Sequence, residues 1–161
     1  MHILKITLIF ILSANCLFAQ DSLNVTKLFQ WDDPTIPAET SFDLNYNEIW
    51  GVAINNREYA IIGSSIGTHI FDVTDPVNST QVAFIAGASG NVIHRDFHDY
   101  QGYLYIVADE GPATLQIVDL NLLPNSAPVV YDSDMLFSRT HNIFIDSLNG
   151  VLYNSNGGVY S

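Results

Sequence analysis

The segment Gly102-Tyr103-Leu104-Tyr105-Ile106-Val107-Ala108 decides the fold, because an earlier segment of the chain has the same pattern. The earlier copy is Glu58-Tyr59-Ala60-Ile61-Ile62-Gly63, with Tyr59 at the position of Tyr103. The strands that follow correspond as well, so that Asp119 lies 47 residues (119 − 72) after Asp72. A third copy begins at residue 140 and places Tyr153 48 residues (153 − 105) after Tyr105. A fixed period of this size indicates a repeat architecture.

Each repeat contains short runs rich in Ile, Val, Phe and Tyr, separated by turn residues. In the first repeat these runs are 49–54, 59–64, 68–73 and 81–86. Four antiparallel strands in about 40 to 50 residues are typical of a β-propeller blade. We therefore expect an all-β fold, a β-propeller with four-stranded antiparallel blades, with a β-sandwich as the alternative.

The length of the chain sets the number of blades. We expect two full blades near 48–90 and 91–137 and part of a third at 138–161. Propellers close with at least about four blades. The sequence is therefore interpreted as an incomplete propeller.

Composition limits the partners. The chain has 161 residues, of which 48% are hydrophobic and 14% charged, and this composition excludes disorder. Seventeen acidic against five basic residues give a formal net charge of −12. Phosphate groups would be repelled by this charge, so the sequence predicts no binding of nucleic acid or of anionic lipid.

The N-terminus has the order of a secretory signal peptide. Lys5 is followed by an apolar run and by small residues, with cleavage expected after Ala19 or Gln20. The run is too short to span a bilayer, and no membrane span is expected in the mature chain. Lipidation at Cys16 is the alternative. We expect residues 1–19 to be removed and the protein to be exported, to the medium or to a bacterial cell surface.

Two further expectations concern the mature chain. Cys16 is the only cysteine, so the exported protein would have neither a disulfide nor a thiolate metal ligand. Residues 20–47 form an N-terminal segment, in which 24–32 is a candidate strand that closes the propeller by completing its last blade.

The order of several motifs resembles the choice-of-anchor B proteins, exported bacterial propellers related to the LVIVD-repeat proteins. The resemblance covers the mature chain from about residue 24. The motifs that carry it are Glu48-Ile49-Trp50-Gly51-Val52, Glu58-Tyr59-Ala60-Ile61-Ile62-Gly63, Gly67-Thr68-His69-Ile70-Phe71-Asp72-Val73-Thr74-Asp75-Pro76, His94-Arg95-Asp96-Phe97, Tyr105-Ile106-Val107-Ala108-Asp109-Glu110, Leu115-Gln116-Ile117-Val118-Asp119-Leu120 and Thr140-His141-Asn142-Ile143. The family often has Trp before its Arg-Asp pair, where this chain has His94.

The resemblance implies a propeller attached to the cell by varied C-terminal signals, and it implies no general enzymatic activity. The chain ends at 159–161 inside an expected strand, so we expect no attachment signal within it.

Propeller geometry suggests a binding site. The first strand of each blade lines the central channel. Alignment of Ile49-Trp50-Gly51, His94-Arg95-Asp96 and Thr140-His141-Asn142 predicts a ring at one channel mouth that could bind a small polar or anionic ligand. The ring would consist of Trp50, Arg95, Asp96, His141 and Asn142. In the alternative interpretation, these are buried residues whose hydrogen bonds fix the entry to each inner strand.

A metal site is a more specific alternative. His98, His141 and Asp96 are candidate ligands for a transition metal in a hydrolase or lyase at the channel mouth, although their spacing matches no zinc motif. Calcium could bind the oxygens of Asp72 to Pro76 or Asp132 to Asp134, but neither loop has the central glycine and closing Glu of strong calcium sites. Asp75-Pro76 is better explained as a turn. Asp109 and Glu110 are expected in a solvated loop.

The preferred interpretation is a non-catalytic binding or scaffold module with no predicted cofactor. Its partner would be a protein, a glycan or a small polar ligand. The metal-dependent enzyme is the alternative function.

Overall fold

The computed structural model describes residues 24–156 and 159–160, which contain eleven strands and no helix. The chain divides into two units, residues 1–30 and 31–161. In the first unit, residues 25–30 have no regular structure, and Lys27 Nζ donates a hydrogen bond to Gln30 Oε1. All the strands of the described residues belong to the second unit. Among the described residues, no helix has the length and apolar character needed to cross a membrane.

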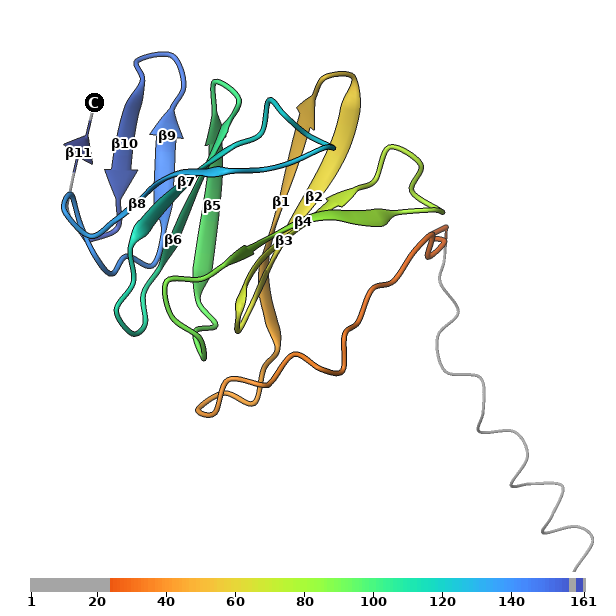
Figure 1. Ribbon diagram of the computed structural model, residues 1–161, viewed down its shortest axis with the longest axis horizontal. Helices are drawn as coiled ribbons and strands as arrows, with labels where there is room; N and C mark the ends of the chain where they lie inside the picture. Colours follow the sequence, from red (N-terminus) through yellow and green to blue (C-terminus); the bar gives the residue numbers. More distant parts are fainter. Residues whose placement is uncertain (1–23, 157–158, 161) are drawn as a thin grey trace, which may run out of the picture. The chain divides into compact units, whose positions relative to one another are not determined.

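The strands form three antiparallel sheets in which sequential strands are neighbours (Figure 1). The first sheet contains β1 (Tyr46–Ile54), β2 (Arg57–Ser64), β3 (Gly67–Asp72) and β4 (Thr80–Ala86). The second contains β5 (Arg95–Tyr100), β6 (Tyr103–Ala108), β7 (Leu115–Asp119) and β8 (Val129–Ser133). The third contains β9 (Ile143–Asp146), β10 (Val151–Asn154) and β11 (Val159–Tyr160).

The same tight turn opens the first two sheets. Asn55 and Asn56 join β1 to β2 with φ values of 52° and 60°, and Gln101 and Gly102 join β5 to β6 with φ values of 51° and 82°. Positive φ at both central residues belongs to the type I′ turn, whose twist matches that of a two-stranded hairpin. Tyr59 lies three residues after the first turn and Tyr103 one residue after the second, so the β1–β2 hairpin is longer by two residues on each strand.

The core lies between the faces of successive sheets, and β6 shows how. Leu104 and Ile106 pack into the core with Tyr59 and Ile61 of the first sheet. Val107, on the opposite face of β6, packs with Ile145 of the third sheet. Since side chains alternate between the two faces of a strand, the second sheet is buried on both faces.

The first strands of the three sheets lie side by side, β1 against β5 and β5 against β9 (Figure 1). The all-β prediction with four-stranded antiparallel sheets is therefore confirmed, with three described strands in the third sheet. The first sheet begins at Tyr46, two residues before the expected start of its blade.

Two expectations for the N-terminus have different outcomes. The predicted signal peptide, 1–19, lies outside the described residues. Residues 24–32, a candidate closing strand, are not a strand in the structure. A strand needs a hydrogen-bonded partner, and none of the described strands pairs with this segment.

His69 on β3 is a buried titratable group, only 4% exposed. Its Nε2 lies 2.9 Å from Ser64 Oγ, and its ring packs between Trp31 and Phe84 with centroid distances of 4.8 and 4.7 Å. Burial lowers the pKa of His69, a hydrogen bond with Gln81 opposes this shift, and the charges of Asp33 and Arg95 act in opposite directions. His69 is therefore held neutral in the folded chain.

We predict that acidification below about pH 6.5 destabilises the fold through His69. The unfolded chain takes up a proton at this histidine that the folded chain resists, so stability present above the unfolded pKa is lost as pH falls. His69→Gln should reduce the loss, as measured by urea denaturation at about pH 7.5 and about pH 5.5. An equal loss in the variant and the parent would contradict this role of His69.

Candidate functional site

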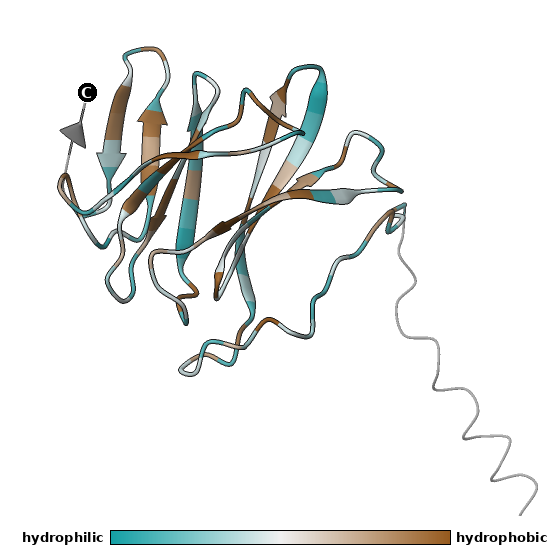
Figure 2. Ribbon diagram, in the orientation of Figure 1, coloured by the Kyte–Doolittle hydropathy of each residue, from teal (hydrophilic) through white to brown (hydrophobic). Residues whose placement is uncertain are grey.

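Polar and ionisable side chains gather on β5, between β1 and β9. Its sequence is Arg-Asp-Phe-His-Asp-Tyr, and Figure 2 shows this strand as largely hydrophilic beside the hydrophobic stretches of its neighbours. A polar strand in the middle of three sheets places hydrogen-bonding groups where β1 and β9 both approach. The residues of both candidate sites described below lie on β5 or close to β1, β6 or β9.

The pairing registers show which residues of the three inner strands correspond. They pair each inner-strand residue with the second strand of its sheet: Trp50 with Ile61, His98 with Tyr105, and Phe144 with Tyr153. Because Tyr59 corresponds to Tyr103 and Tyr105 to Tyr153 in the repeats, Trp50, His98 and Phe144 are equivalent.

The predicted alignment of Trp50 with Arg95 is therefore wrong. Tyr46 is the first residue of β1 and pairs with Ser64, just as Arg95 is the first residue of β5 and pairs with Ala108. Hydrophobic pattern placed the start of the strand near Ile49, whereas β1 starts earlier and contains an irregularity between Asn47 and Ile49.

Trp50, His98 and Phe144 form what we call the aromatic row. The ring centroids of Trp50 and His98 are 4.9 Å apart, and those of His98 and Phe144 are 5.5 Å apart with the planes at 86°. Trp50 Nε1 donates a hydrogen bond of 2.9 Å to Asp99 Oδ1. Phe144 is 59% exposed, while Trp50 and His98 are half-buried. The row thus combines accessible aromatic surface with a carboxylate and an imidazole.

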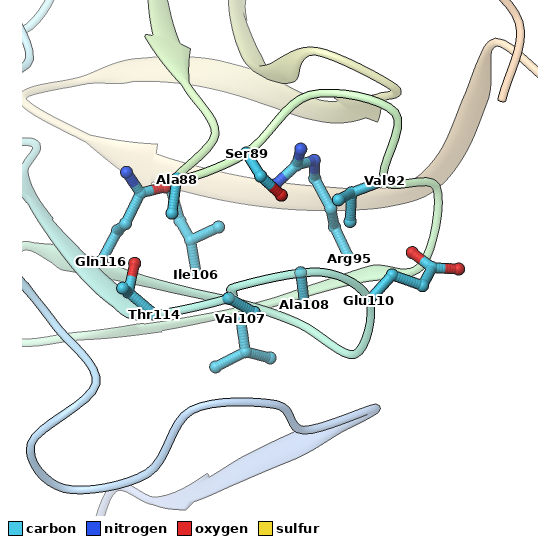
Figure 3. A pocket seen from close by; sticks show the side chains of 11 residues that line it. Ala88, Ser89, Val92, Arg95, Ile106, Val107, Ala108, Glu110, Thr114 and Gln116 are labelled. Carbon is cyan, nitrogen blue, oxygen red and sulfur yellow. The ribbon is translucent and has the colours of Figure 1, made fainter.

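Arg95, a predicted ring residue, is buried. Its Nε donates to Ser64 O at 2.9 Å, and its Nη2 has no partner among the described residues. Burial lowers the pKa of Arg95 to about 10, while the charge of Glu110 opposes this shift, so the guanidinium stays charged at neutral pH. Figure 3 shows Arg95 and Ser89 among the side chains that line a small pocket. The pocket has room for about one water molecule. The pocket is too small for an organic ligand.

Asp96 is also buried, and its role is structural. Asp96 Oδ2 accepts a hydrogen bond of 2.6 Å from the backbone N of Ile143, the first residue of β9. The equivalent Asn47 on β1 donates from Nδ2 to Arg95 O, at 3.1 Å. Both side chains thus connect one inner strand to the next. The alternative interpretation, of buried hydrogen-bonding residues at the inner strands, fits Asp96 best.

The two remaining ring residues lie before β9 and are exposed. His141 Nδ1 lies 2.5 Å from Asp109 Oδ2, and the backbone N of Asn142 donates to Ser155 Oγ at 3.1 Å. Among the described contacts, none joins the side chains of two of the five predicted ring residues. The structure therefore distributes them over separate environments.

A second group forms where the start of β5 meets the end of β6. His94, Asp109, Glu110 and His141 make up this histidine–carboxylate cluster. His94 Nδ1 contacts Glu110 Oε1 and lies 3.6 Å from Asp109 Oδ1, while the rings of the two histidines are 5.4 Å apart. Sequence reasoning placed Asp109 and Glu110 in a solvated loop; instead, both are partly buried in this cluster.

The metal ligands predicted from the sequence are not brought together. Asp96 binds a backbone amide of β9, His98 belongs to the aromatic row, and His141 contacts Asp109. Pairing of β5 with β6 and of β9 with β10 fixes these residues at different levels of their strands, which the sequence spacing did not show.

The two calcium candidates are turns or strand residues. Asp72 accepts from Thr74 N and pairs with Arg57, and Asp75 accepts from Val77 N. Asp132 accepts hydrogen bonds from the side chains of Thr114 and Gln116. The turn interpretation of the 72–76 loop is confirmed.

Comparisons with known protein families, with curated proteins and with solved structures gave no match to this chain.

We predict that Asp96→Ala destabilises the fold by about 1–3 kcal/mol, because it leaves the buried amide of Ile143 without an acceptor. Hydrogen exchange should accelerate at this amide, and urea denaturation should report the lost stability. Asp96→Asn, which keeps an acceptor oxygen, should lose less, and Asp134→Ala on the surface should lie near the parent. Unchanged exchange at Ile143 in the alanine variant would contradict the structural role.

Proposed function

We propose that this chain is part of an exported, non-catalytic binding module with a β-propeller architecture, and that the aromatic row is its ligand site. The proposal unites the sheet arrangement, the sequence repeats and the resemblance to the choice-of-anchor B proteins. The observation that carries the function is the alignment of three aromatic rings on three neighbouring inner strands.

Two features support the propeller. Inner strands that lie side by side, with sheets packed face to face, are the arrangement of neighbouring blades. The outer face of the first sheet exposes apolar side chains, of which Ile49 on β1 is 65% exposed. In a propeller each blade is packed against its neighbours, so this surface fits the approach of a further blade.

The ligand class follows from the chemistry of the row. Aromatic faces favour a ligand with apolar patches, while the Asp99 carboxylate and the His98 imidazole favour hydroxyl donors and acceptors. Oligosaccharides present both kinds of group along an extended chain. Exposed Phe144 and half-buried Trp50 would contact successive sugar rings, with His98 between them. A glycan is therefore the partner that we propose.

The exported location rests on the N-terminal pattern. Residues 1–19 have the basic start, apolar middle and small cleavage-site residues of a signal peptide, and glycans are abundant outside cells. Attachment to the cell surface is proposed from the resemblance alone.

We predict that the chain binds oligosaccharides and that Trp50→Ala and Phe144→Ala each weaken binding about 3- to 10-fold, the worth of one aromatic contact. The measurement is a glycan-array screen followed by calorimetric titration of the best oligosaccharide. Phe84→Ala removes an exposed aromatic side chain of β4, away from the row, and should bind like the parent. Binding that all three variants retain equally, or no binding to any glycan, would contradict the proposal.

A further inference from the structure

The histidine–carboxylate cluster unites three segments that are distant in sequence. Arg95 pairs with Ala108 in the β5–β6 hairpin, so the residues just outside this pair, His94 and Asp109, must meet; Asp109 N donates to His94 O at 3.2 Å. Thr140 N donates to Ala108 O at 3.0 Å and brings the segment before β9 to the same place. The cluster therefore bridges the second and third sheets.

Its ligand atoms converge. One atom from each of His94, Asp109 and Glu110 lies within 4.8 Å of the others. Zinc bonds to nitrogen and oxygen are about 2.0–2.2 Å long, so the ligands of one ion are about 3–4 Å apart. His141 Nδ1, 2.5 Å from Asp109 Oδ2, adds a second imidazole on the other side of that carboxylate. With the three converging groups, His141 would complete a set of four ligands.

Backbone hydrogen bonds orient the carboxylate of Glu110. Its Oε2 accepts from the backbone N atoms of Ile93 and His94, at 2.9 and 3.0 Å. These bonds leave Oε1 directed at His94 Nδ1. Hydrogen bonds that fix the outer side of a ligand group are typical of metal sites.

One oxygen of the Asp109 carboxylate lacks a hydrogen-bond donor. Its Oδ1 is shielded from solvent and has no hydrogen-bond partner among the described residues. Within the described part of the chain, neither Asp109 nor Glu110 forms an ion pair with Lys or Arg; histidines are their ionic partners. A buried carboxylate oxygen without a partner is costly, and a bound cation would remove that cost.

We propose that His94, Asp109, Glu110 and His141 bind a divalent transition metal ion of the zinc class. Two carboxylates match the charge of a divalent ion, and imidazole with carboxylate suits zinc and similar metals. Calcium is disfavoured because it takes six to eight oxygen ligands. Since His141 precedes β9 and the other ligands flank β5 and β6, the ion would connect the second sheet to the third. This site shares no residue with the aromatic row, and its proposal does not rest on the proposed glycan site.

Calorimetric titration of the metal-stripped full chain with Zn²⁺ alone tests the proposal. Cys16→Ser serves as the background, so that its thiol cannot bind the metal. We expect about one zinc per chain and a higher melting temperature with zinc. His94→Ala and Asp109→Asn should each bind zinc at least about tenfold more weakly. Asp134→Asn, which removes one carboxylate of the 132–134 segment, should bind like the background.

Melting in EDTA separates loss of the fold from loss of the site. Should Asp109→Asn not fold, His141→Gln, at an exposed position, should still weaken zinc binding and reduce the rise in melting temperature. No zinc binding by the background chain, or equal affinity in the His94, His141 and Asp134 variants, would overturn the proposal. Loss of glycan binding in the row variants would leave it unaffected.

Discussion

Burial of the second sheet on both faces is the constraint on which the rest of the structure depends. Alternate residues of β6 serve two different cores, with Leu104 and Ile106 toward the first sheet and Val107 toward the third. Removing apolar surface from water contributes about 25 cal/mol per Å² to stability. Two buried faces therefore stabilise the second sheet more than an isolated sheet could be stabilised. Face-to-face packing in turn makes β1, β5 and β9 neighbours. The positions of both candidate sites follow from that adjacency.

The packing of the sheets also explains why the inner strands carry polar residues. Backbone groups along the open edges of β1 and β5 have no ladder partner on that side, and buried polar groups must be hydrogen-bonded. Asn47 and Asp96 meet this need by bonding the backbone of the next inner strand. Arg95 bonds a carbonyl of the first sheet in the same way. Polar residues on β5 therefore contribute to the fold before they contribute to any ligand site.

The sheets could be predicted from the sequence because they depend on local patterns: a tyrosine repeated at Tyr59 and Tyr103, and alternating apolar residues. The register of β1 could not be predicted, since the hydrophobic pattern does not show that Tyr46 begins the strand. Aligning the two turns, Asn55-Asn56 on Gln101-Gly102, would not have corrected this, because it places Trp50 on Asp96; the β1–β2 hairpin is longer than the β5–β6 hairpin by two residues on each strand. The histidine–carboxylate cluster could not be found in this way, because its members come from three loops whose proximity depends on the pairing of β5 with β6 and on the approach of β9.

The two sites share β5 without overlapping. His98 lies four positions after His94, which in an extended strand is about 13 Å, so no small ligand contacts both histidines. Both sites nevertheless depend on the spacing between β5 and β9, since His98 contacts Phe144 and His141 contacts Asp109. Asp96 fixes the same spacing through the amide of Ile143. A metal ion at the cluster would therefore stiffen the strand pair that carries two of the three rings of the aromatic row, and would reduce the conformational freedom that ligand binding at the row must otherwise remove.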